Sequence, residues 1–157
     1  MADVGINNID IVAGGETAGI PYSAFIADRL DKPMVYIRKK PKGHGAMSQI
    51  EGDFQGIKKP NVVLVEDLQN YGTSQQVFID ALRQVPATID HSFVIFNYDI
   101  HPSQRKALKD QKITLHYLTT WWDVLDVARE NKYFDTKTLA VVESFLNAPA
   151  KWQEENT

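Results

Sequence analysis

The sequence contains no cysteine among its 157 residues. This absence excludes disulfide bonds, thiolate nucleophiles and zinc sites built on cysteine. A chain without cysteine is also consistent with a reducing compartment.

Long apolar runs and a strong excess of one charge are also missing. No run is long enough to cross a bilayer, and residues 1–8, MADVGINN, lack the basic and then apolar pattern of a signal peptide. The 17 lysines and arginines face 20 aspartates and glutamates, giving a net charge of -3 that does not indicate nucleic-acid binding. We therefore expect a cytoplasmic protein that binds neither nucleic acid nor membrane.

Apolar runs alternate with amphipathic runs along most of the chain. The length fits one domain with one core, and 43% hydrophobic residues is ordinary for a globular protein. Periodicity predicts strands at 9–13, 34–37, 62–65, 92–96 and 113–118, and helices at 20–30, 74–85, 102–109, 121–130 and 136–146.

This alternation predicts the α/β class: a single domain with an open, mostly parallel five-stranded sheet flanked by helices. Ligands bind beyond the carboxyl ends of the strands in such sheets. That rule selects three segments as candidate ligand sites: 14–19, 38–52 and 66–74.

The stretch NVVLVEDLQNYGTSQQVFIDALRQV, residues 61–85, ends an apolar run in Glu66 and Asp67 and continues through a glycine turn into an amphipathic run. Free amides at a helix N-terminus bind phosphate, whereas carboxylates beside them suit sugar hydroxyls or a magnesium ion. The pattern therefore fits a sugar phosphate. It equally fits a helix capped by Thr73 or Ser74 after a strand that happens to end in acids.

The segment YIRKKPKGHGAMSQIEG, residues 36–52, places Arg38, Lys39, Lys40 and Lys42 within five positions, with His44 close behind. Its glycines predict a mobile loop over residues 39–52 that grips and releases a polyanion. The alternative is a solvated basic loop without a ligand.

A third segment, AGGETAGIP at residues 13–21, does not have the G-x-G-x-x-G spacing of a dinucleotide site. Its glycines still allow a tight loop whose amides face an anion. Trp121 and Trp122 are interpreted as packing residues, and the remaining histidines lack metal spacing.

Together, VVLVEDLQNYGTS, YIRKKPKGHG and GGETAGIP resemble the type I phosphoribosyltransferase family, most closely its orotate-specific branch. The resemblance covers essentially the whole chain and includes LNAPAKW near its end. It implies a transferase of pyrimidine nucleotide synthesis that forms orotidine 5'-phosphate and pyrophosphate from orotate and phosphoribosyl diphosphate, with Mg2+. It also implies a homodimer that shares an active-site loop.

The resemblance assigns roles to individual residues. Glu66 and Asp67 would hold the ribose hydroxyls directly or through the metal ion, with Asp67 also counted as catalytic. The 5'-phosphate would lie in a turn formed by Asn70, Tyr71, Gly72, Thr73 and Ser74. Pyrophosphate would be neutralised by the catalytic loop residues Arg38, Lys39, Lys42 and His44, and bound by a loop of Glu16, Thr17, Ala18 and Gly19.

The chain departs from the family pattern in three places. Asn70 stands where the family usually has threonine, followed by the bulky Tyr71, and the segment FNYDIHP at residues 96–102 has no arginine to meet the orotate carboxylate. Family members also carry a further N-terminal segment that closes over the base. Two hypotheses therefore stay open: an orotate phosphoribosyltransferase-like enzyme, and a non-catalytic or truncated relative that binds phosphoribosyl diphosphate or a nucleotide as a sensor.

Overall fold

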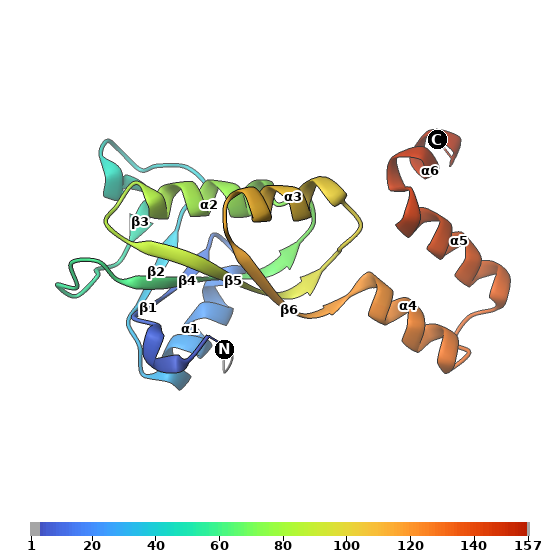
Figure 1. Ribbon diagram of the computed structural model, residues 1–157, viewed down its shortest axis with the longest axis horizontal. Helices are drawn as coiled ribbons and strands as arrows, with labels where there is room; N and C mark the ends of the chain where they lie inside the picture. The colour runs from blue at the N-terminus through green and yellow to red at the C-terminus, as the bar shows by residue number, and fades with distance from the viewer. Residues whose placement is uncertain (1–3, 157) are drawn as a thin grey trace.

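Six strands form one sheet in the computed structural model, which describes residues 4–156 (Figure 1). Their order across the sheet is β3-β2-β1-β4-β5-β6. All neighbours pair in parallel except β2 and β3, which are antiparallel. The strands are β1 Ile11–Gly15, β2 Met34–Ile37, β3 Ile50–Glu51, β4 Asn61–Gln69, β5 Thr88–Asn97 and β6 Thr114–Thr120.

Helices cover both faces of this sheet. α1 packs on one face over a core that includes Val12, Val63 and Val65, whereas α2 and α3 pack on the other over Ile11, Leu64 and their neighbours (Figure 1). The helices are α1 Gly19–Leu30, α2 Thr73–Arg83, α3 Pro102–Asp110, α4 Trp121–Glu130, α5 Thr136–Asn147 and α6 Pro149–Asn156, with short 3-10 turns η1 Ile6–Asn8 and η2 Ala46–Gln49.

The open, mostly parallel α/β sheet flanked by helices is confirmed, but the expected count of five strands is wrong. The sixth strand, β3, lies within the segment predicted to be an irregular loop and pairs Glu51 with Tyr36 and Ile50 with Ile37. It satisfies backbone groups on the otherwise open edge of β2. A strand of two residues is too short to leave a periodic signal in the sequence.

β4 is also longer than the apolar run that predicted it. It continues through Glu66 and Asp67 to Gln69 because β5 extends alongside, pairing Glu66 with Val94 and Gln69 with Asn97. The two acids therefore lie within the strand, four and three residues before the turn, rather than at its end.

The last three helices form an arm that extends away from the sheet (Figure 1). Leu125, Leu139 and Leu146 are buried within it. Trp121 joins the arm to the sheet through edge-to-face contacts with Phe96 and Tyr98, at ring centroid distances of 5.1 and 5.7 Å. The interpretation of this tryptophan as a packing residue is confirmed.

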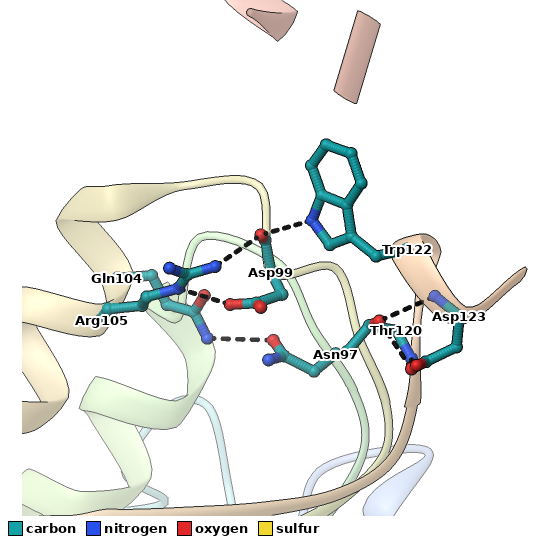
Figure 2. Close-up of polar contacts among 7 residues, drawn as sticks. All are labelled: Asn97, Asp99, Gln104, Arg105, Thr120, Trp122 and Asp123. Atoms are coloured by element: carbon teal, nitrogen blue, oxygen red, sulfur yellow. Dashed lines mark hydrogen bonds and ion pairs between the residues drawn. The ribbon is translucent and has the colours of Figure 1, made fainter. Parts of the chain in front are cut away.

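Hydrogen bonds fix where the arm begins. The Thr120 hydroxyl accepts from the amide of Asp123, while the Asp123 carboxylate accepts from the Thr120 amide and hydroxyl (Figure 2). These bonds from Thr120 lower the pKa of Asp123. Among the residues described, no helix is long and apolar enough to span a membrane.

Candidate active site

The three predicted ligand segments follow β1, β2 and β4, which are adjacent parallel strands, so they meet at one edge of the sheet. A side-chain contact joins the first two segments. The Glu16 carboxylate accepts a hydrogen bond of 2.8 Å from the backbone amide of Lys39. The Glu16 amide in turn donates to the Ile37 carbonyl at 2.9 Å. The segment after β1 is thus hydrogen-bonded to the start of the cationic segment, residues 38–52.

Glu66 is the buried carboxylate of this edge, with 6% of its surface exposed. Glycines form the wall around it. A side chain added at Gly15 would collide with the Glu66 carboxylate and with Phe78, and one added at Gly19 would meet the same carboxylate and the Val65 carbonyl. The glycines of the 13–21 segment therefore make room for Glu66, a tertiary contact that the sequence pattern does not reveal.

Burial raises the pKa of Glu66 from its ordinary value of 4.5 to about 8. Loss of solvation is the main cause, and the neighbouring Asp67 charge adds to it; the Lys39 charge and hydrogen bonding from the Gly15 backbone act in the opposite direction. Its Oε1 atom is buried without a hydrogen-bond partner in the protein. A ligand hydroxyl or a cation at this carboxylate would supply the interaction that the protein leaves out.

The raised pKa predicts a stability that falls with rising pH. Between about pH 4.5 and 8 the folded chain keeps a proton on Glu66 that the unfolded chain releases, so the free energy of unfolding decreases by as much as ~4 kcal/mol. Glu66→Gln removes this dependence. Urea unfolding of the wild type and the variant from pH 5 to 8.5 measures it as a difference, in which contributions common to both proteins cancel.

Exposed Glu130→Gln is the control, and we expect its unfolding free energy to follow the wild type across the whole range. Parallel curves for wild type and Glu66→Gln would show that Glu66 is ionised throughout.

The turn after β4 encloses a small hollow. It has a volume of about 210 Å³ and is lined by Glu66, Leu68 and residues 69–75. α2 begins at Thr73, and its N-cap is Gly72, which has a φ of 82°. No side chain caps this helix, so the prediction of a Thr73 or Ser74 cap is wrong. Because no side chain caps this end, amides of the first turn remain available to an anion.

Tyr71 does not fill this hollow, although its size suggested a conflict with a phosphate. Tyr71 is 65% exposed, and its ring stacks on His101 at the start of α3, with centroids 3.9 Å apart and planes inclined by 20°. Tyr71 and His101 are 30 positions apart in the sequence, so no local pattern could have predicted the stack.

The cationic segment contains more secondary structure than predicted. It contains η2 and β3, and Glu51 of β3 accepts from Arg38 at 3.4 Å and lies 3.9 Å from Lys42. Lys39 and His44 are exposed. Within residues 4–156, no hydrogen bond or ion pair joins Lys42 or His44 to the Glu66 region. Their role there, and the mobility of residues 39–52, stay predictions.

The loop after β5, predicted to lack an arginine, does have one beside it in space. Arg105 of α3 donates to the Asp99 carboxylate at 2.6 Å and to the Asp99 carbonyl at 3.2 Å, and Trp122 donates to the same carbonyl at 3.2 Å (Figure 2). The contact with Asp99 raises the pKa of Arg105. This guanidinium is therefore already engaged by a carboxylate.

The carboxylates present fit a magnesium ion only in part. No group of three or more potential ligands from histidine, cysteine, aspartate and glutamate occurs among the residues described. Mg2+ commonly binds through one or two carboxylates together with substrate oxygens and water. Glu66 and Asp67 therefore suit an ion that is brought in with a phosphorylated ligand.

This fold and this site define the class of protein. Residues 3–123 match the model of the phosphoribosyl transferase domain. The orotate phosphoribosyltransferase of Aeropyrum pernix has a similar structure, with a TM-score of 0.65 and 27% identity over 85% of this chain and 77% of that chain. The chain belongs to the phosphoribosyltransferase family.

Several curated sequence relatives of this chain are named orotate phosphoribosyltransferases. Orotate phosphoribosyltransferases of Sinorhizobium fredii and Roseobacter denitrificans are 49% and 51% identical to it over 99% of its length. These matches confirm the resemblance to the orotate-specific branch. The chain spans about two thirds of the length of these curated relatives, 66% and 68% respectively.

Proposed function

We propose that the protein transfers the phosphoribosyl group of phosphoribosyl diphosphate to orotate, forming orotidine 5'-phosphate and pyrophosphate. One observation carries the proposal: a buried carboxylate, an uncapped turn and a cationic segment share one sheet edge, as a ligand with a ribose, a phosphate and a pyrophosphate requires. The names of the relatives support orotate as the acceptor.

The assigned residues form three groups, each of which binds a different part of phosphoribosyl diphosphate. Glu66 and Asp67 hold the ribose hydroxyls, and amides of the turn at residues 70–74 hold the 5'-phosphate. The 16–19 loop and the cations Arg38, Lys39, Lys42 and His44 neutralise pyrophosphate as it leaves. Preorganised donors of this kind stabilise charge that develops in the transition state.

Two further parts of the proposal concern a metal ion and a second subunit. Mg2+ would be held by Glu66 and Asp67 through ribose hydroxyls or water, and would neutralise charge on the diphosphate. The cationic segment would serve the neighbouring subunit of a homodimer, which is consistent with the absence of a hydrogen bond or ion pair from Lys42 or His44 to Glu66 among the described residues. A cytoplasmic location stays a prediction.

The direct test is turnover. Incubating the chain with phosphoribosyl diphosphate, orotate and Mg2+ should consume orotate and release one pyrophosphate per orotidine 5'-phosphate, as measured by chromatography. Tight binding of phosphoribosyl diphosphate without turnover would instead support the non-catalytic alternative. Binding of neither substrate would contradict both hypotheses.

The engaged arginine leads to a prediction about the base. Arg105 already pairs with Asp99, so orotate alone should bind weakly and leave the melting temperature unchanged. Phosphoribosyl diphosphate with Mg2+ should raise it, because a ligand that binds only the folded state stabilises that state. Thermal-shift titration measures both. Strong stabilisation by orotate alone would show that another group holds its carboxylate.

A further inference from the structure

A chain of buried polar side chains lies beneath the turn at residues 70–74. Gln69, Gln75 and Ser92 are 2%, 3% and 0% exposed. The Gln69 amide donates to the Gln75 carbonyl oxygen at 2.6 Å, and the Gln75 amide donates to the Ser92 hydroxyl at 2.7 Å. Buried amides are costly unless they are hydrogen-bonded, and these two are bonded to each other.

The bonds link the two ends of the turn. Gln69 is the last residue of β4, and Gln75 is the third residue of α2, so their side chains meet across the five residues between them. Ser92 then ties the pair to β5. The Gln69 carbonyl also accepts from the Tyr98 amide at 2.8 Å.

The same side chains support the apex of the turn. A Cβ atom added at Gly72 would lie 3.0 Å from the Gln69 amide nitrogen and 3.7 Å from Gln104. Gln104 is itself 2% exposed and donates to Asn97 at 3.2 Å (Figure 2). The apex therefore rests on buried amides with no room to collapse inward, in the left-handed conformation that Gly72 permits.

We propose that Gln69 and Gln75 are positioning residues, whose hydrogen-bonded pair holds the turn at residues 70–74 in the conformation that binds the 5'-phosphate. The inference rests on the proposed function. Backbone amides bind an anion well only when they already converge on it, because ordering a loose turn opposes binding. An apolar pair could fill the same space, but it would not fix the separation of β4 and α2 by directional bonds.

The test compares two probes that use different parts of the site. Ribose 5-phosphate occupies the turn, whereas pyrophosphate contacts the 16–19 loop and the cationic segment. Gln75→Leu removes both hydrogen bonds of the Gln75 side chain while keeping a similar volume. We expect a roughly tenfold weaker Kd for ribose 5-phosphate and a pyrophosphate Kd within about twofold of wild type, both by isothermal titration.

Ile79→Val is the matched control, because Ile79 is buried on the same helix one turn beyond Gln75 and belongs to the apolar core. It should lower stability slightly and leave both affinities unchanged. Gln69→Leu should mimic Gln75→Leu, and the double variant should bind no worse than either alone, because the Gln69–Gln75 hydrogen bond is lost in each case. Amide hydrogen exchange of residues 70–75 should be faster in all three.

The outcomes separate the two proposals. Equal loss of both probes in Gln75→Leu, or unchanged ribose 5-phosphate binding with unchanged exchange, would overturn the positioning role alone. If the wild type binds neither ribose 5-phosphate nor pyrophosphate, the proposed function is overturned, and the inference with it. If Gln75→Leu does not fold, the smaller change Ser92→Ala tests the same role by removing the Gln75–Ser92 hydrogen bond.

Discussion

Replacing Glu66 with Gln and Asp67 with Asn together is expected to abolish binding of phosphoribosyl diphosphate while leaving the fold intact. The fold should survive because burial of an ionised carboxylate at Glu66 is unfavourable, as its raised pKa shows. A neutral amide at this position avoids that desolvation penalty. Binding should fail because the ribose hydroxyls and the accompanying Mg2+ lose their carboxylate partners. Isothermal titration measures the affinity, and circular dichroism checks the fold.

Simple electrostatics predicts the opposite result, which makes the experiment decisive. Above about pH 8, where Glu66 is mostly ionised, removing two negative charges near a polyanion should strengthen its binding if the carboxylates have no direct role. Asp90→Asn with Asp110→Asn is the control, since both are exposed and the pair removes the same charge elsewhere. Unchanged or tighter binding in the Glu66/Asp67 variant would show that the site assignment is wrong.

The order of strands and helices could be predicted because it depends on local patterns. Val62–Val65 is continuous in valine and leucine, as expected for a strand covered on both faces, and all four residues are buried. β3 could not be predicted in the same way, since it forms only where Ile50 and Glu51 meet the edge of β2. The extension of β4 through Glu66 likewise depends on its partner β5.

The same difference between local patterns and distant partners applies to the site. Its three segments could be identified because parallel strands bring their carboxyl ends to one edge. What each residue touches could not be predicted, because those partners are distant in sequence: Gly15 against Glu66, Tyr71 against His101, and Gln75 against Ser92. Gln69 and Gln75 read as ordinary polar residues of a turn and a helix, and only their burial distinguishes them.

Replacing Lys42 and His44 with alanine is expected to reduce turnover by roughly two to three powers of ten, the usual effect of removing donors that stabilise developing charge. Substrate affinity should change much less, because Glu66 and the turn at residues 70–74 lie elsewhere. Lys42 faces Glu51 at 3.9 Å in this structure, so it must leave that partner to meet pyrophosphate. Steady-state kinetics separates kcat from KM.

Lys58→Ala with Lys59→Ala is the control for lost positive charge, since both lysines are exposed and lie just outside the cationic segment. If that segment serves a neighbouring subunit, mixing the Lys42/His44 variant with the Glu66/Asp67 variant should restore activity. Random exchange makes half of the dimers hybrids with one intact site each, so about a quarter of wild-type activity should return. No recovery despite proven subunit exchange would show that the segment acts within its own chain.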